Sequence, residues 1–250
     1  MKNRIVHINP AYELLRPFVE SVTQRFELDG ETIYKGRNLI KVFEAEGLRI
    51  NVKRYHTPFF INSLIYSYFR PSKGWRAFTY PQRLLQAGIS TPEPIAYVEE
   101  RCCGLIGLSY FISIQKPHAR NFYEFGTNIV TDCVDIIEAF ARFTARLHES
   151  GIYHRDYSPG NILFDKINGE WDFCLVDINR MHFGTVSLEK GCANFARLWG
   201  KTPFFLILAQ TYAEARGYDP ELCRVLILKY RQSFWNHYRL KHSVRFPIDI

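Results

Sequence analysis

The segment 151–165, GIYHRDYSPGNILFD, constrains the fold of this chain more than any other stretch. It follows a segment whose apolar residues at positions 136, 140, 143 and 147 recur at helical spacing, and Gly151 ends that helix. After it, ILFD and WDFCLVD flank Asn168-Gly169, which is a strong hairpin-turn signal. The sequence therefore predicts a polar loop held between a long helix and a β-hairpin.

The first half of the chain has a different pattern. Residues 10–26 have helical periodicity, and then ETIYKG, LIKVFEAE and LRINVKRYH predict three antiparallel strands. A short aromatic helix is expected at 61–70. A second helix is expected over 72–88, started or kinked by Pro81 and ended by Gly88. Residues 94–115 predict two more strands with a turn near 101–104, followed by a polar connector.

Residues 187–250 read as helical throughout, and Asp219-Pro220-Glu221 marks a helix start. The order is thus about five strands with one main helix, a long helix, a loop, a hairpin and further helices. This predicts an α+β fold in two lobes. The amino-terminal lobe, residues 1–115, is a strand-rich sheet lobe for nucleotide phosphates. The carboxyl-terminal lobe, residues 116–250, is mostly helical and carries the loop.

The positive charge of the chain lies in its first half. The net charge is +7; residues 1–120 hold 17 Lys and Arg against 10 Asp and Glu, whereas residues 121–250 hold 15 of each. Between Glu46 and Glu93 there is no acidic residue. Such a field suits nucleotide phosphates, a phosphorylated sugar, anionic lipid or nucleic acid. We expect no nucleic acid as partner, because no recognised nucleic-acid motif accompanies the charge.

The six cysteines contain no CxxC pair and none is placed for a zinc site, so we expect reduced thiols. The amino terminus shows no apolar signal segment, and the longest apolar runs, such as 203–209, are too short to span a bilayer. A cytoplasmic protein is expected.

The polar residues of the loop are of the types that phosphoryl transfer needs. Asp156 can orient the attacking hydroxyl, and Asn161 and Asp177 offer the hard oxygen donors that Mg²⁺ prefers. Lys53, in the last strand of the meander, can hold nucleotide phosphates, although Lys41 and Arg54 compete for that role. His154-Arg155-Asp156 with Asn161 five residues later matches the H-R-D-x-x-x-x-N catalytic loop of protein kinases. The simpler alternative is a turn whose Asp and Asn cap backbone groups.

HRDYSPGN and LVDIN, together with GISTPEPIAY, resemble the lipopolysaccharide kinase (Kdo/WaaP-type) family, over roughly residues 28–240. The resemblance implies a bilobal protein-kinase-like fold that uses ATP and Mg²⁺. It implies a lipid-linked sugar acceptor, a Kdo or heptose hydroxyl of the lipopolysaccharide inner core, at the inner face of the inner membrane. In it Asp156 is the catalytic aspartate, Asn161 and Asp177 bind metal, and Lys53 contacts phosphate.

Three departures from kinase patterns bear on this expectation. No G-x-G-x-x-G loop is present, so Gly36 and Arg37 in the first strand turn are the candidates for covering phosphates. Asp177-Ile178-Asn179 stands where protein kinases have D-F-G. The helix at 72–87 has no carboxylate to pair with Lys53, which leaves Gln82, Thr79 or Tyr80 to orient the lysine.

Alternatives therefore stay open. One is a kinase-like phosphotransferase acting on another small molecule or on a protein, and another is a pseudokinase that binds nucleotide without turnover. The basic stretch 49–83 and the segment FFINSLIYSYF are either a solvated face with ordinary packing or a peripheral contact with the anionic inner membrane or a phosphorylated glycolipid.

Overall fold

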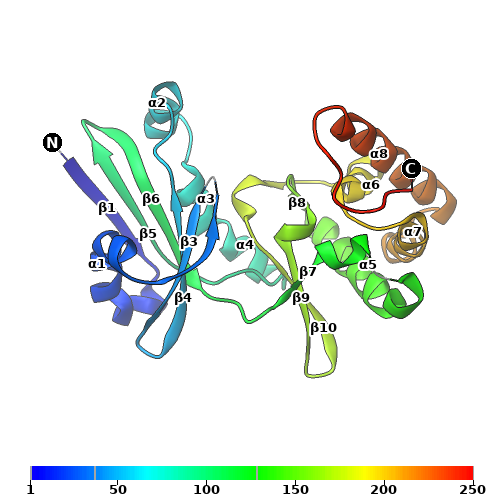
Figure 1. Ribbon diagram of the computed structural model, residues 1–250, viewed down its shortest axis with the longest axis horizontal. Helices are drawn as coiled ribbons and strands as arrows, with labels where there is room; N and C mark the ends of the chain where they lie inside the picture. The colour runs from blue at the N-terminus through cyan, green and yellow to red at the C-terminus, as the bar shows by residue number, and fades with distance from the viewer. Residues whose placement is uncertain (1, 37, 128, 250) are drawn as a thin grey trace. The chain divides into compact units, whose positions relative to one another are not determined.

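The computed structural model describes residues 2–36, 38–127 and 129–249. The chain forms two compact units. The N-terminal unit comprises Met1–Arg83 and Thr91–Pro117, and the C-terminal unit comprises Leu84–Ser90 and His118–Ile250. The first holds an antiparallel sheet and the second is largely helical (Figure 1), so the α+β fold class is confirmed. The roles that we expect for residues 1–115 and 116–250 stay predictions.

A six-stranded antiparallel sheet forms the N-terminal unit, in the order β1-β5-β6-β4-β3-β2. Its strands are β1 (Lys2–Ile8), β2 (Glu31–Lys35), β3 (Leu39–Ala45), β4 (Leu48–Tyr55), β5 (Pro94–Cys102) and β6 (Leu105–Ile114). Five of them lie where the sequence predicts strands. The strand β1 was not predicted, because its partner β5 is about ninety residues away in the chain and seven residues alone give a weak strand signal.

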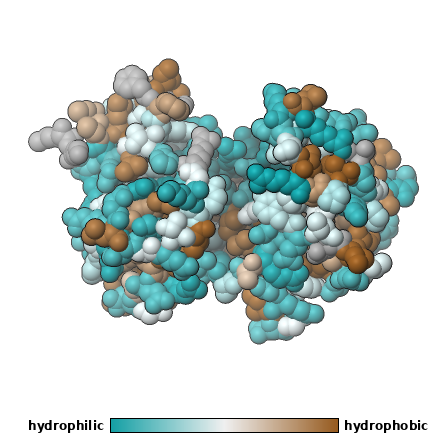
Figure 2. All heavy atoms as spheres, viewed as in Figure 1, coloured by the Kyte–Doolittle hydropathy of each residue, from teal (hydrophilic) through white to brown (hydrophobic). Residues whose placement is uncertain are grey.

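Three short helices follow β4, and the first of them exposes apolar side chains. They are α2 (Phe60–Tyr68), α3 (Lys73–Thr79) and α4 (Pro81–Gln86). The helix expected over 72–88 is broken before Pro81, as its ring requires, and Gly88 follows with a φ of +69°. Ile61 and Tyr68 of α2 are exposed, and Figure 2 shows hydrophobic residues gathered at the top of the view, where Figure 1 labels α2.

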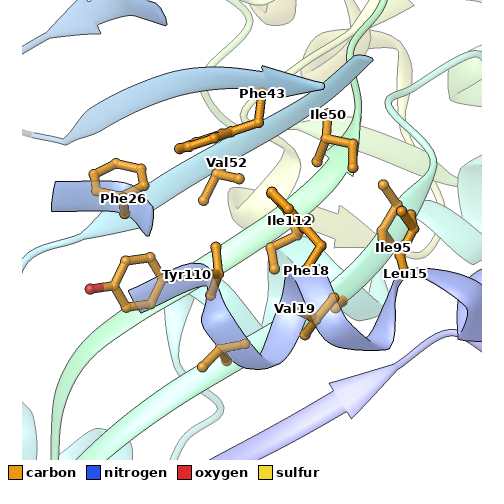
Figure 3. Packing of buried hydrophobic residues seen from close by; sticks show 13 residues of the cluster. Leu15, Phe18, Val19, Phe26, Phe43, Ile50, Val52, Ile95, Tyr110 and Ile112 are labelled. Carbon is orange, nitrogen blue, oxygen red and sulfur yellow. The ribbon is translucent and has the colours of Figure 1, made fainter. Parts of the chain in front are cut away.

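The core of the N-terminal unit lies between α1 (Arg16–Leu28) and one face of the sheet. A 3₁₀ turn, Pro10–Leu15, leads into this helix. Figure 3 shows Phe18, Val19 and Phe26 of α1 gathered against the side chains of Val52 and Ile112 from the central strands. Burial of this apolar face by the helix is the main stabilisation of the unit, because each large aliphatic or aromatic side chain contributes roughly 1.5–3 kcal/mol.

In the C-terminal unit, small sheets lie on either side of the loop in the chain. A hairpin of β9 (Ile162–Ile167) and β10 (Glu170–Leu175) turns at Asn168 and Gly169, whose φ angles are +52° and +87°. These left-handed angles are those of the tight turn that Asn-Gly predicts. The short strand β7 (Arg120–Asn121) pairs with β9, and β8 (Ile152–His154) pairs with β11 (Met181–Phe183).

Helices make up most of the rest of this unit: α5 (Val134–Glu149) and α6 (Leu188–Asn194) pack on the strands, and α7 (Thr202–Arg216) and α8 (Pro220–Arg239) pack on these helices and on each other. Asp219 caps α8 as expected, accepting from the backbone N–H of Glu221 at 2.7 Å. Short 3₁₀ turns lie at Phe122–Gly126, Val130–Cys133, Pro159–Asn161, Ile178–Arg180 and Phe195–Arg197.

Two expectations for this unit were wrong in part. The polar connector after residue 115 also contains the core residue Phe122, whose ring centroid lies 4.1 Å from that of Phe140 in α5. The last residues are not helical. They fold back because the buried Arg231 donates to the Asp249 carboxylate at 2.9 Å and to the Gly200 carbonyl at 2.7 Å.

Candidate active site

The loop between β8 and β9 is held from inside by His154. Its ring is fully buried; Nε2 donates to the Val176 carbonyl at 3.1 Å, and Nδ1 accepts from the backbone N–H of Asp156 at 3.1 Å. Burial lowers the pKa of His154, so the ring is neutral and both nitrogens are used in these two bonds. His154 therefore fixes Asp156 relative to the end of the hairpin, as a scaffold rather than a reactant.

A second buried histidine extends this scaffold into the helices. Asn194 of α6 donates to the His154 carbonyl at 2.9 Å and accepts from His148 Nε2 at 3.0 Å. His148, in the last turn of α5, accepts at Nδ1 from the Tyr212 hydroxyl of α7 at 2.8 Å. Burial lowers the pKa of His148 to about 4, so it stays neutral near pH 7. Asn194 thus bonds α6 to the backbone at the start of the loop, and His148 links α5 and α7 to Asn194.

Two arginines contact the Asp156 carboxylate. Arg197, the last residue of the 3₁₀ turn Phe195–Arg197, donates to Oδ1. The Arg180 guanidinium lies 3.5 Å from Oδ2. Neither arginine was predicted as a site residue from the sequence. Arg180 lies only three residues after Asp177 and its position was a usable signal, but Arg197 is 41 residues from Asp156 in the chain, and nothing in its local pattern marks it. The pair holds the carboxylate in one orientation and offsets its charge.

Asn161 and Asp177 are brought to the same end of the hairpin by its register. Ile162 pairs with Leu175, and the Val176 N–H donates to the Asn161 carbonyl at 3.0 Å. The Asn161 side-chain amide donates to the Asp156 carbonyl at 2.9 Å. Three of the predicted site residues, Asp156, Asn161 and Asp177, are therefore joined through one side-chain-to-backbone bond, one backbone bond and the peptide link from Val176 to Asp177.

Asp177 adopts a left-handed backbone conformation, with φ +54° and ψ +40°. This conformation costs a non-glycine residue of the order of 1 kcal/mol or more and persists where the surroundings impose it. The Asn179 side-chain amide donates to Asp177 Oδ1 at 2.5 Å and fixes the carboxylate. Asn179 stands where D-F-G has glycine, so it adds a side-chain contact that D-F-G lacks, while the buried Ile178 stands where D-F-G has the apolar phenylalanine.

The donor set at this place fits Mg²⁺. Because the Asn161 amide nitrogen is committed to the Asp156 carbonyl, its oxygen is directed away from that bond, and Asp177 adds a carboxylate. Within the described residues, no three His, Cys, Asp or Glu side chains form a group suited to a metal ion. A magnesium ion here would have two protein ligands and take its others from phosphate and water, which is its usual mode with nucleotides.

Lys53 lies in the middle of β4, in register with Ile40 of β3 and Phe111 of β6. The predicted alternation is confirmed: Val52 is in the core under α1, while Tyr55, on the Lys53 face, packs with Phe111. The Lys53 ammonium lies 5.4 Å from the centre of the Tyr55 ring. Lys53 thus projects from the sheet face opposite α1.

The two competitors of Lys53 have structural roles on the α1 face. Lys41 donates to the Phe26 and Asp29 carbonyls at 2.8 and 2.7 Å, which satisfies the carboxyl end of α1. Arg54 pairs with Glu27 and lies over the Phe26 ring. These contacts favour Lys53 as the phosphate-binding cation.

The turn between β2 and β3 contains Gly36, whose N–H donates to the Asn38 carbonyl at 3.0 Å. A side chain at Gly36 would collide with the Tyr34 hydroxyl, 2.5 Å from the position of a Cβ. Arg37 lies outside the described residues. The expectation that this turn covers phosphates stays a prediction.

Comparison with known proteins gives one family and a common fold. The model of the lipopolysaccharide kinase (Kdo/WaaP) family matches residues 29–201. No curated protein matches the sequence. Among solved structures, WaaP in complex with acyl carrier protein is similar with a TM-score of 0.62 at 17% identity, over 94% of this chain and 99% of that one. A microcompartment-associated aminopropanol kinase is similar with a TM-score of 0.59 at 10% identity, over 91% of each chain.

Proposed function

The chain belongs to the lipopolysaccharide kinase (Kdo/WaaP) family and is therefore an ATP-dependent phosphotransferase, and we propose that it phosphorylates a sugar hydroxyl of a lipid-linked glycan. The acceptor that we favour is the lipopolysaccharide inner core, at a Kdo or heptose residue, on the cytoplasmic side of the inner membrane. One observation carries the assignment of the phosphoryl-transfer site: Asp156, Asn161 and Asp177 are held together by the hydrogen bonds of one loop and one hairpin end. The choice of acceptor rests on the family.

Asp156 has the catalytic role in this proposal. Its carboxylate oxygens have about four lone-pair directions, so contacts from Arg197 and Arg180 leave room to accept a bond from an acceptor hydroxyl. In phosphoryl transfer the attacking oxygen needs orientation more than full deprotonation, because the transition state is largely dissociative. A carboxylate fixed by two arginines suits that task.

Asn161 and Asp177 would hold magnesium, and Lys53 would hold nucleotide phosphate. Bound magnesium supplies charge neutralisation for the transferring phosphoryl group. The task of the protein residues is to fix the ligand oxygens before binding. The Asn161 amide is oriented by the Asp156 carbonyl, and the Asp177 carboxylate by Asn179. Gly36 and Arg37 are the proposed cover over the phosphates.

The direct test is transfer of labelled phosphate from Mg²⁺–ATP to purified lipid-linked glycan. We expect Asp156→Asn to lower kcat by about 10²–10⁴-fold, which is the usual contribution of a positioned acid–base group. The matched control is Asp132→Asn, an exposed carboxylate in the same unit. Equal rates for wild type and Asp156→Asn would reject the site. Transfer to soluble alcohols, amino alcohols or protein but not to glycolipid would assign the kinase another acceptor.

The metal assignment is tested in the same assay by varying Mg²⁺. Asp177→Asn removes one ligand charge, so we expect the Mg²⁺ concentration for half-maximal rate to rise at least tenfold. Asp165→Asn, on the hairpin strand β9, is the control and should keep the wild-type requirement. An unchanged requirement in Asp177→Asn would place the metal elsewhere.

We also propose a peripheral contact with an anionic bilayer, made by the surface around α2. Phe59 and Phe69, at either end of α2, are 88% and 84% exposed. Arg70 follows directly, and the sequence from 47 to 92 has no acidic residue. No helix of the described chain is long and apolar enough to cross a membrane. Exposed aromatic residues beside cations are typical of a surface that enters the headgroup region of anionic lipid.

Sedimentation with vesicles tests this contact. We expect binding to vesicles containing phosphatidylglycerol at low salt, weak binding to phosphatidylcholine alone, and loss of binding in Phe59→Ser/Phe69→Ser. Leu14→Ser/Leu28→Ser, which removes two exposed apolar residues near α1, is the control. Binding that is the same in both double variants would show that α2 is not the contact.

A further inference from the structure

A cavity of about 680 Å³ lies within the C-terminal unit, and Asp156 is one of its lining residues. It is built from the 3₁₀ turn Phe122–Gly126, the loop after β8, the segment after α6, the end of α8 and the carboxyl-terminal tail. A hydroxyl of a molecule in this cavity can reach the carboxylate that we assign to catalysis. The residues that line the rest of the cavity then determine which molecule fits.

Much of the wall lies outside the part of the chain that the family model matches. That match ends at residue 201, whereas Phe234 and Tyr238 of α8 and residues 243–245 of the tail all line the cavity. The tail is held in place by the Arg231–Asp249 ion pair and by Phe246, which is buried. The family match therefore does not specify the residues of this wall, and these residues can determine which acceptor this chain selects.

Two further lining residues, Tyr123 and Trp199, present aromatic rings that are held by ring contacts. The Tyr123 ring meets the Trp199 ring edge to face, with 4.6 Å between centroids, and Trp199 stacks on Phe246 at 4.7 Å. Gly160 of the catalytic loop lets Tyr123 approach, because a Cβ there would lie 3.0 Å from that ring. Aromatic surface with a few polar groups at its rim matches a pyranose, whose ring faces carry C–H groups and whose edge carries hydroxyls.

The charged groups of the cavity favour an anion. Asp156 is the carboxylate among the lining residues, and Arg197 and Arg245 are the cations. Arg197 is paired with Asp156, and its guanidinium lies over the Phe234 ring at 5.4 Å. Arg245 is exposed at the rim. An arginine fork binds carboxylate or phosphate oxygens in pairs, so Arg245 suits an acidic substituent of the sugar.

We propose that this cavity is an acceptor subsite for a pyranose bearing an acidic group, with its ring against Tyr123 and Trp199 and its anion on Arg245. The inference rests on the proposed function, because it places the reacting hydroxyl at Asp156. It goes further in assigning selectivity to α8 and the tail. Arg245 is a specificity-determining residue here and takes no part in the phosphoryl step.

The test measures binding and transfer separately, with deacylated inner-core glycan as the probe. Calorimetry compares the native glycan, its dephosphorylated form and its carboxyl-reduced form. We expect Arg245→Gln to weaken binding of the native glycan at least tenfold and to raise its KM similarly, with kcat and the KM for ATP changed less than twofold. Arg245→Lys should restore part of the affinity. Arg239→Gln, an exposed arginine at the end of α8 that does not line the cavity, is the control.

The outcomes separate this inference from the proposed function. Weaker binding of only the dephosphorylated glycan identifies phosphate as the anion, and weaker binding of only the carboxyl-reduced glycan identifies carboxylate. Equal binding of all three forms, or an Arg245→Gln variant that binds as wild type does, would overturn the acceptor subsite even if transfer occurs. Arg245-dependent binding without phosphate transfer to the glycan would support the subsite and reject the proposed acceptor.

Discussion

The surroundings of the Asp156 carboxylate include residues that the local sequence does not reveal. The spacing of Asp156 to Asn161 predicts a catalytic loop, and the Asn161 amide donates to the Asp156 carbonyl. The arginine on Oδ1 comes from a 3₁₀ turn after α6. Such a contact arises from how the chain packs, so a single sequence contains no periodic or motif signal for it. The carboxylate pair Asp156 and Asp177 was predictable; the cations around it were not.

Lys53 and Lys41 give a matched pair for testing the phosphate-binding lysine. Both are on adjacent strands of the same sheet, but Lys41 is bonded to two carbonyls at the end of α1. We expect Lys53→Met to lower nucleotide affinity or kcat by at least about 30-fold with little change in melting temperature, because a charged contact to phosphate contributes about 2 kcal/mol or more. Lys41→Met should lower the free energy of unfolding by about 1 kcal/mol and leave nucleotide affinity unchanged.

Nucleotide titration monitored by fluorescence measures the nucleotide affinity of each variant. Thermal unfolding of the same variants measures their stability. If Lys41→Met lost nucleotide binding while Lys53→Met kept it, the assignment of the two lysines would have to be exchanged.

At the scale of elements, the hairpin and α5 show which parts of the site follow from sequence. Asn168-Gly169 predicts both the turn and the register, and the register alone brings Val176 to Asn161. The periodicity of α5 predicts its buried face but not that His148, at its end, bonds to Asn194 of α6 and Tyr212 of α7. Contacts between helices far apart in sequence need the tertiary packing to be known.

The buried His148 makes the free energy of unfolding depend on pH. In the folded protein its pKa is about 4, whereas in the unfolded chain an ordinary histidine takes up its proton near pH 6.5. The unfolding free energy is therefore unaffected by this group above pH 6.5 and falls as the pH drops from there towards 4. Near pH 4 the unfolding free energy lost through this group approaches about 3 kcal/mol. His154, whose pKa burial also lowers, acts in the same direction.

Urea denaturation between pH 7 and pH 4.5 checks this dependence. His148→Gln keeps groups that can bond to Asn194 and Tyr212 but cannot take up a proton. We expect this variant to lose a large part of the pH dependence that the wild type shows over that range. His237→Gln, an exposed position on α8, should not alter it. A His148→Gln curve parallel to that of wild type would contradict a neutral, buried His148.

At the scale of the whole molecule, the order of strands and helices predicted the α+β class because strands alternate with turn signals and helices have a clear period. The first strand, β1, and the folded-back tail could not be predicted, since both are fixed by partners distant in sequence, Tyr97 and its neighbours in β5 and Arg231 in α8. The tail lines part of the cavity beside Asp156, so the selectivity that we propose for this cavity could not be predicted from the sequence.

The proposed reaction adds one phosphate to a lipid-linked glycan, so the mass of that glycan in cells reports the reaction without an assumed assay substrate. Cells that make the protein should contain a glycan species heavier by one phosphate than cells lacking it. Wild-type protein should restore this species and Asp156→Asn, present at the same level, should not. A glycan mass that is identical with and without the protein, or restoration by Asp156→Asn, would contradict the account.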